Sequence, residues 1–223
     1  MLPLTKFWVL EGFNLFNKIG RNNMMHICEI LEMKYVNKGD IIELISENKE
    51  KVYFLKNGTV KIVNRDSDVA KYIVNKGNIF GELVLYDQEA AIEQQAVALD
   101  DCVICSIEAN QMTILMNQHE SLKNEVFKVY GLRIKKLERR LQDLLYKDSG
   151  TRIKEFILDY ILDFGKSSND RIIAKNLLSH KDIAHLTNTS RQTVSNTMST
   201  LRKNKIIDYN SQYISIHKQQ KSK

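Results

Sequence analysis

The sequence holds few cysteines, one proline and no long apolar run. Its 223 residues include three cysteines, Cys28, Cys102 and Cys105, an odd number without the spacing of a disulfide framework. Such cysteine usage favours a reducing compartment. No stretch approaches the roughly 20 apolar residues that span a bilayer, and the first residues lack the basic start and apolar core of a signal peptide. We therefore expect a soluble, cytoplasmic protein without a membrane partner.

Acidic residues become scarce toward the carboxyl end of the chain. The net charge is +6, but residues 1–149 carry 20 Lys and Arg against 21 Asp and Glu, whereas residues 150–223 carry 13 against 6. The whole excess of positive charge therefore lies in the last third. Positive charge confined to one region is typical of a surface that binds polyphosphate. A solubilising tail would explain only the final lysines.

Glycine recurs in one part of the chain, between Tyr35 and about Ser106, where short β-rich runs alternate with Asn and Asp. Turns there need a backbone free to take positive φ, which glycine supplies. This pattern of short β-rich runs separated by turn residues predicts an antiparallel all-β roll or barrel. Residues 13–33, before it, are expected to form a short helical lead-in. The four turn glycines are Gly39, Gly58, Gly77 and Gly81.

Residues 119–150 are predicted to form a long helix with a thin apolar stripe. The stripe has coiled-coil spacing with one register skip near Gly131. At about 1.5 Å per residue, about 28 helical residues make a rod roughly 40 Å long. We expect two copies to pair along it, giving a homodimer; packing on its own domain is the alternative. The predicted dimer residues are Leu122, Val126, Val129, Leu137, Leu141 and Leu144.

The last third has the pattern of three helices followed by a hairpin. Residues 150–165 form an amphipathic helix that Gly165 is placed to end. Two further helices within residues 178–207 are joined by "LTNTS", where Asn188 suits a left-handed turn position. Two short β runs around "YNSQ" close the chain. Because Val194, Met198 and Leu201 recur at helical spacing, they are predicted to bury one side of the second helix.

The open side of that second helix is polar, and residues 183–207 contain no Asp or Glu. A merely solvated face is the alternative, but it rarely lacks acidic groups altogether. Arginine can fork onto guanine O6 and N7, and Gln or Asn onto adenine N6 and N7. The predicted base-reading residues are Arg191, Gln192, Ser195 and Asn196. The predicted phosphate-binding residues are Ser179, Lys181, Thr189, Ser190 and Thr193.

The segment "DIAHLTNTSRQTVSNTMSTLRKNKII" (182–207) resembles the helix-turn-helix of the cAMP receptor protein/FNR family of bacterial transcription regulators. The segments "KGDII" (38–42), "YFLKNGTVKI" (53–62) and "GNIFGELVLY" (77–86) resemble that family's cyclic-nucleotide-type sensor domain. The resemblance implies an α+β fold with an antiparallel β-roll of the jelly-roll kind over 1–118, a dimerisation helix over 119–147 and a winged helix-turn-helix over 148–223. It also implies an effector pocket at Gly81, Glu82 and Leu83.

The sequence departs from the members of that family that bind cAMP. In those members Gly-Glu-Leu is followed about ten residues later by Arg-Ser-Ala, whose arginine neutralises the cyclic phosphate. Residues 87–100 here contain no Arg or Lys, and Glu93 stands about where the cation is wanted. The members that bind cAMP also present hydroxyls from the dimer helix to its base, whereas residues 122–148 here contain no Ser or Thr. Since a buried phosphate without its cation is strongly disfavoured, cAMP is not expected to be the effector.

Other cofactors of the family fit no better, and none is predicted. An iron–sulfur cluster needs a group of amino-terminal cysteines, and only Cys28 lies there. Cys102 and Cys105 are predicted to lie on opposite faces of a strand, as core thiols and not metal ligands. The sequence does not place His26 and His119, so haem stays open as a ligand.

The sequence thus predicts a homodimeric transcription regulator that binds a palindromic double-stranded DNA site and responds to an unidentified effector. RNA polymerase is a further partner that the resemblance suggests. The alternative is a small-molecule sensor acting through a protein partner. An enzyme is not expected, because metal-ligand pairs, a Ser/His/Asp set and a phosphate-cradling glycine loop are missing.

Many relatives have Glu and Arg where this chain has Gln192 and Asn196, so we expect a half-site shifted toward A·T-rich steps.

Overall fold

The structure is a computed structural model, and it describes residues 7, 10, 13–16, 19–46, 49–86 and 92–218. The chain forms two compact units, one ending at Lys136 and the other beginning at Leu137. Within the described ranges, none of the helices combines the length and the apolar character needed to cross a lipid bilayer.

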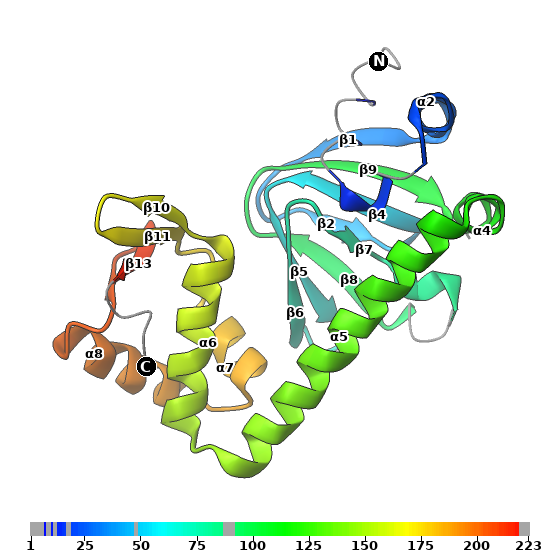
Figure 1. Cartoon of the computed structure of the whole chain (residues 1–223). Helices are drawn as coiled ribbons and strands as arrows, with labels where there is room; N and C mark the ends of the chain where they lie inside the picture. Colours follow the sequence, from blue (N-terminus) through cyan, green and yellow to red (C-terminus); the bar gives the residue numbers. More distant parts are fainter. Residues whose placement is uncertain are drawn as a thin grey trace. The chain divides into compact units, whose positions relative to one another are not determined.

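The first unit is an antiparallel β-roll built from two sheets (Figure 1). One sheet has the strand order β1-β9-β4-β3, with β7 paired to β4, and the other has the order β2-β8-β5-β6. The prediction of an antiparallel roll is therefore confirmed. Its strands are β1 (Glu32–Val36), β2 (Ile41–Glu43), β3 (Ile45–Ser46), β4 (Lys49–Asn57), β5 (Thr59–Asn64), β6 (Ala70–Asn75), β7 (Ile79–Phe80), β8 (Gln94–Ala98) and β9 (Cys102–Glu108).

Short helices accompany the strands of this unit. They are η1 (Asn14–Phe16), α2 (Arg21–Ile30), η2 (Glu82–Leu85), α4 (Ala109–Gln118) and the beginning of α5 (Glu120–Tyr146). The expected helical lead-in over 13–33 is too long, because Leu31 already has an extended backbone and Glu32 pairs with Ser106 in the sheet. The sequence analysis also missed α4, which follows β9 directly.

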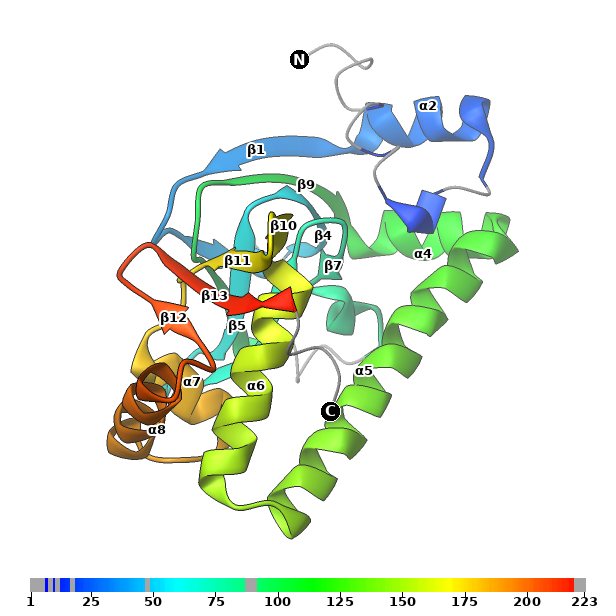
Figure 2. The same cartoon turned by 60° about the vertical axis from the view of Figure 1, so that its left-hand side comes forward.

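The second unit is a winged helix (Figure 2). Its helices α7 and α8 pack side by side, and α6 packs against both. The predicted order of three helices and a hairpin is present, but β10 and β11 were not predicted; they extend the hairpin to a sheet of order β10-β11-β13-β12. The elements are α6 (Ser149–Phe164), β10 (Lys166–Ser168), β11 (Arg171–Lys175), α7 (His180–Thr187), α8 (Arg191–Lys203), β12 (Asp208–Tyr209) and β13 (Tyr213–His217).

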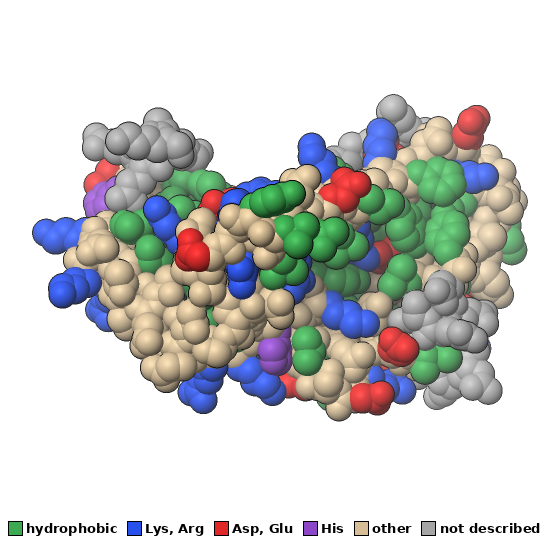
Figure 3. Space-filling view, turned by 90° about the horizontal axis from the view of Figure 1, so that it is seen from below, with side chains coloured by type: hydrophobic (Ala, Val, Ile, Leu, Met, Phe, Trp, Pro, Cys, Tyr) green, Lys and Arg blue, Asp and Glu red, His purple; other side chains and the backbone are tan. Residues whose placement is uncertain are grey.

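The carboxyl-terminal part of α5 exposes a row of large apolar side chains. Leu137, Leu141 and Leu145 are 63%, 59% and 69% exposed, and Ile134 belongs to the same row. Leu144 is half-buried. Figure 3 shows hydrophobic side chains, in green, at several places on one face of the molecule. Exposed apolar residues that follow one helix face are typical of an interaction surface.

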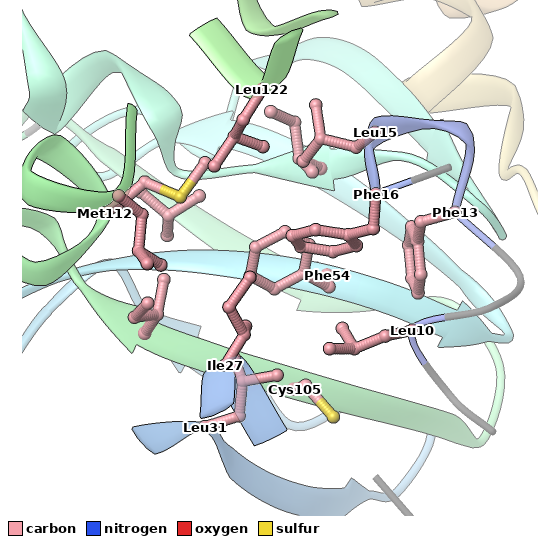
Figure 4. Close-up of a cluster of buried hydrophobic side chains, with 14 of the residues drawn as sticks. Leu10, Phe13, Leu15, Phe16, Ile27, Leu31, Phe54, Cys105, Met112 and Leu122 are labelled. Atoms are coloured by element: carbon pink, nitrogen blue, oxygen red, sulfur yellow. The ribbon is translucent and has the colours of Figure 1, made fainter. Parts of the chain in front are cut away.

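Two apolar cores lie on the two faces of the sheet that contains β4 and β9. Val52 and Phe54 of β4 point into a core that the helices cover, while Tyr53 and Leu55 point into the core between the sheets. Figure 4 shows the helix-covered core, with Phe54 beside Phe16 and Phe13. Alternation along β4 therefore places successive residues in different cores.

The cysteines follow the same rule. Cys105 lies in the helix-covered core and Cys102 in the core between the sheets, so the prediction that they occupy opposite faces of a strand is confirmed. All three cysteines are buried and unpaired by disulfides. Burial raises the pKa of the Cys102 thiol.

The beginning of α5 completes the helix-covered core, which corrects part of the predicted dimer seam. Leu122 and Val126 are 0% exposed, and Figure 4 places Leu122 next to Met112 of α4. Val129 packs half-buried against the same core. The prediction that Leu122 and Val126 line a dimer seam is wrong, since both side chains are fully buried within the first unit. For the half-buried Val129 it stays a prediction. The structure also divides the expected helical domain 119–147 between the two units.

Candidate nucleic-acid interface

Helix α7 begins at a capping box that Ser179 and Asp182 form. The Ser179 hydroxyl donates to Asp182 Oδ2 at 2.6 Å and accepts from the Asp182 backbone N–H at 3.1 Å. The Asp182 carboxylate in turn accepts from the Ser179 backbone N–H at 3.0 Å. This arrangement satisfies two helix-end donors. Ser179, a predicted phosphate ligand, therefore already has a structural role, while Lys181 beside it is exposed.

The turn between the two helices depends on Asn188, as predicted. Asn188 has φ +51° and ψ +59°, the left-handed conformation, and its N–H donates back to the end of α7. Thr189 N–H then donates to the Ala184 carbonyl at 2.9 Å. The hydroxyls of Thr187 and Thr189 lie 3.0 Å apart. Asparagine tolerates this backbone better than other non-glycine residues, so the turn reverses the chain tightly without glycine.

Two arginines that the sequence analysis missed support this turn. Arg152 of α6 donates from Nε to the Thr187 carbonyl at 3.1 Å and from Nη2 to the Asn188 carbonyl at 3.2 Å. Arg140 of α5 donates to the His185 carbonyl at 2.8 Å. Both guanidiniums bind carbonyls at the end of α7, where cations are favoured. No sequence signal identifies these partners, because they are backbone atoms far along the chain.

Helix α8 buries one side and exposes the other. Val194, Met198 and Leu201 are 0%, 1% and 5% exposed, as predicted. Ser190 caps the helix, because its hydroxyl oxygen accepts from the Thr193 N–H at 3.0 Å. The hydroxyls of Ser190 and Thr193 also lie 2.8 Å apart, so these two predicted phosphate ligands stand together at the helix start.

The predicted base-reading residues share the outer side of α8. Arg191, Gln192 and Asn196 are exposed, and Ser195 is half-buried. Gln192 Nε2 donates to Asn196 Oδ1 at 3.0 Å, one turn along the helix. This bond leaves the Gln192 oxygen and the Asn196 amide group for further partners. Two amides side by side offer both donors and acceptors, which the edge of an A·T pair requires.

The charge at the start of α8 favours an anion. Its first turn has no acidic residue and begins with Arg191. A cation at a helix amino terminus opposes the helix dipole and costs roughly 0.3–1 kcal/mol, whereas an anion there is stabilised. A phosphate would complement both the dipole and the arginine. The start of α8 is therefore suited to a polyanion.

The residues of the predicted effector pocket are held by contacts within the first unit. Glu82 is 0% exposed and forms an ion pair with Arg133 of α5. Gly81 has φ +75°, and a Cβ there would lie 2.8 Å from the Lys51 carbonyl oxygen, so the residue must be glycine. Leu83 is half-buried and packs against the helix-covered core. The sequence analysis missed Arg133, because a long helix rich in charges gives no sign of which charge turns inward.

The remaining residues that the sequence singled out lie apart from one another. Glu93 is exposed, and residues 87–91 fall outside the described ranges. His26 is exposed beside Glu29, with 3.3 Å between Nδ1 and Oε2. His119 follows the end of α4. Among the residues that the structure describes, no three His, Cys, Asp or Glu side chains gather as metal ligands.

Comparison with protein families supports the division into two parts. Residues 33–119 match the cyclic nucleotide-binding domain, and residues 151–221 match the Crp-like helix-turn-helix domain. The chain is 26% identical over 191 residues to a global nitrogen regulator of Nostoc sp., covering 80% of this chain and 86% of that protein. It is 24% identical to the anaerobic regulatory protein of Bacillus subtilis, covering 71% and 68%.

Solved structures share this fold as well. FixK2 from Bradyrhizobium japonicum has a TM-score of 0.71 at 17% identity, covering 86% of this chain and 94% of that one. A CooA mutant from Carboxydothermus hydrogenoformans has a TM-score of 0.68 at 21% identity, covering 88% of each chain. At these identities the likeness to solved structures establishes the fold alone. The family assignment depends on the two matching family models. The chain belongs to the cAMP receptor protein/FNR family of DNA-binding transcription regulators, which are not enzymes.

Proposed function

We propose that the chain acts in the cytoplasm as a homodimer that reads a palindromic double-stranded DNA site with two copies of α8. The observation that carries this proposal is the acid-free outer side of α8, with Arg191, Gln192 and Asn196 exposed above a fully buried inner side. A second helix with this arrangement docks its amino-terminal residues against base edges in the major groove. RNA polymerase is the protein partner that such a DNA-bound regulator would meet.

Each polar residue near the start of α8 has a role that follows from its donors. Arg191 is proposed to fork onto guanine, and the Gln192–Asn196 pair to read an adenine, with Ser195 beside them. Lys181, Thr189, Thr193 and the amides at the helix starts are proposed to hold phosphate oxygens. Ser179 and Ser190 would contribute through the helix starts that they cap, since their hydroxyls are already used there.

The exposed row on α5 is proposed to form the dimer seam. Ile134, Leu137, Leu141 and Leu145 expose apolar surface at helical spacing, which a second copy of α5 would bury. Two-fold pairing would present two α8 helices to half-sites about one DNA turn, roughly 34–36 Å, apart. The proposed seam therefore begins after Arg133 and does not include Leu122 or Val126.

An effector other than cAMP is proposed to modulate the β-roll. The Glu82 carboxylate and the Arg133 guanidinium already neutralise each other in an ion pair. A cyclic phosphate placed beside Glu82 would therefore face a buried carboxylate whose cation is taken, which is unfavourable. The proposal includes no resident metal or iron–sulfur cluster, and haem stays among the candidate effectors.

Selection of bound duplexes from random DNA tests this function. We expect a palindrome whose half-sites differ from the ordinary family sequence at the positions facing Gln192 and Asn196. Binding should weaken log-linearly as salt is raised, because DNA binding releases counterions. Binding of no duplex at low salt, in the presence of nucleotides, haem and small metabolites, would instead favour a sensor that acts through a protein partner.

A further inference from the structure

A small cavity lies within the second unit, between the end of α8 and the sheet of the wing. Its volume is about 310 Å³, at the lower end of the roughly 300–1,000 Å³ of small-molecule sites. The chain that leaves α8 forms one wall and continues into β12, which pairs with β13 (Figure 2). We call this cavity the wing pocket. The residues of its lining that matter below are Arg171, Arg202, Lys205, Ile206, Asp208 and Ile216.

Positive charge exceeds negative charge in the wing pocket. The cations Arg171, Arg202 and Lys205 share the lining with one carboxylate, that of Asp208. Arg171 Nη1 lies 3.4 Å from Asp208 Oδ2, and Arg202 Nε lies 3.9 Å from Asp208 Oδ1. Both distances exceed the roughly 2.7–2.9 Å of a charge-assisted hydrogen bond. Asp208 therefore holds the two guanidiniums near each other without engaging either closely, and an excess of two positive charges faces the cavity.

Lys205 has an unusual backbone conformation. Its φ is +57°, in the left-handed region that favours glycine at the end of a helix. Among the described residues, the other non-glycine residues with positive φ are Asp68, Asn169 and Asn188, whose side chains tolerate this conformation. The Lys205 N–H donates to the Arg202 carbonyl at 3.0 Å, which closes α8. A lysine where glycine or asparagine would fit the backbone better indicates that its charge has a function there.

The inner wall of the wing pocket is apolar. Ile216 is 4% exposed, and Ile206 is half-buried. An apolar wall beside cations favours an organic anion over an inorganic ion, because the carbon part of the ligand removes apolar surface from water. His217, the histidine of the lining, has its own acidic neighbour, since its Nδ1 lies 3.3 Å from Asp170 Oδ2.

We propose that the wing pocket binds a small phosphorylated metabolite, whose phosphate monoester is held by Arg171, Arg202 and Lys205. A phosphate monoester carries about 1.5–2 negative charges at pH 7, which matches the excess charge of the pocket. A phosphodiester or a single carboxylate carries one. The guanidinium and ammonium groups come from different elements and can donate to different oxygens of one phosphate.

This site is separate from the base-reading residues. Arg191 begins α8 and the wing pocket lies at the other end of the helix, which has 13 residues. At about 1.5 Å per residue the two ends are roughly 18 Å apart. The proposal therefore goes beyond the proposed function and concerns the free protein, whether or not it binds DNA.

Titration calorimetry on the full chain without DNA, at fixed ionic strength, tests the site with phenyl phosphate as the probe. We expect saturable binding of one molecule per chain. Lys205→Asn keeps the left-handed backbone and Arg171→Gln removes a guanidinium from another wall. Each should weaken binding at least about tenfold, the loss expected for one hydrogen bond to a charged group. Lys203→Gln, which removes an exposed cation of α8 outside the lining, is the matched control and should leave binding unchanged.

Three outcomes would overturn the proposal. One is the absence of saturable binding in the unaltered protein. Another is an equal loss in Lys203→Gln and Lys205→Asn, which would mean attraction to the surface charge in general. The third is binding of dimethyl phosphate or succinate as tightly as phenyl phosphate, which would assign the pocket to a DNA phosphodiester or to a dicarboxylate. Thermal unfolding of each variant shows that a loss of binding is not a loss of fold.

Discussion

Arg191 is the first helical residue of α8, where its charge opposes the helix dipole. We expect Arg191→Ala to leave the thermal midpoint unchanged or slightly raised. DNA affinity should fall by roughly 1–3 kcal/mol, with preference relaxed at one base pair. Competition binding against a panel of single-base variants of the selected site measures both effects.

Lys181→Ala is the matched control for Arg191, since it removes an exposed cation from the neighbouring helix start. It should weaken binding to all duplexes about equally. The slope of log affinity against log salt concentration should fall by roughly one, because one fewer counterion is released. A uniform loss in Arg191→Ala, with the base preference intact, would show that Arg191 contacts phosphate and not a base.

Asn188 supplies the left-handed backbone conformation of the turn. Because its φ is +51°, Asn188→Gly should retain stability and DNA binding. Asn188→Val should lower the free energy of unfolding by roughly 1–3 kcal/mol, since β-branched residues are strained there. Chemical denaturation of both variants compares them. Equal stability of the two would mean that the turn relaxes to another conformation.

At the scale of elements, α5 carries two sets of apolar residues that differ in exposure. The exposed set begins after Arg133 and the buried set ends near Val129. We expect Leu137→Asp/Leu141→Asp to convert the proposed dimer to a monomer, because a carboxylate cannot be buried in an apolar seam at low cost. The thermal midpoint of the β-roll should stay unchanged. Sedimentation velocity measures the mass.

Leu122→Ala provides the contrast on the same helix. It should destabilise the β-roll by roughly 2–5 kcal/mol, the usual cost of a cavity at a fully buried leucine. The proposed dimer should stay intact at temperatures below unfolding. If instead Leu137→Asp/Leu141→Asp stays dimeric, the seam lies elsewhere on the molecule.

At the scale of the whole molecule, the buried tyrosines predict a loss of stability in alkali. Burial raises the pKa of Tyr53 to about 12 and raises the pKa of Tyr72 and Tyr130 as well. A group whose folded pKa lies above its unfolded value near 10 stabilises the fold below pH 10 and loses this contribution as the pH rises through the folded value. Tyr53 alone would contribute on the order of 2 kcal/mol to the free energy of unfolding below pH 10.

Denaturant unfolding at pH 9 and pH 11, together with tyrosine absorbance at 295 nm, checks this expectation. Tyr35 and Tyr146, which are 71% and 83% exposed, serve as the reference that ionises first. We expect the buried tyrosines to ionise only as the protein unfolds. Ionisation of all nine tyrosines in one step near pH 10, without loss of structure, would contradict it.

The amino-acid sequence alone determined the features that depend on neighbours along the chain. The left-handed turn at Asn188, the buried side of α8 and the opposite faces of Cys102 and Cys105 all follow from local periodicity and backbone preference. The antiparallel roll followed from alternating β runs separated by glycine turns. These predictions were correct because helix and strand periods fix which side chains share a face.

Only the tertiary structure decided what covers each apolar face and which charges meet. Leu122 and Leu137 belong to one stripe of coiled-coil spacing, yet one is 0% and the other 63% exposed. The pair of Glu82 with Arg133, and the hold of Arg140 and Arg152 on the α7 carbonyls, join segments far apart in the sequence. The spacing of apolar residues along the sequence shows which face of a helix or strand a side chain is on. The residue that it contacts there depends on how distant segments of the chain fold together.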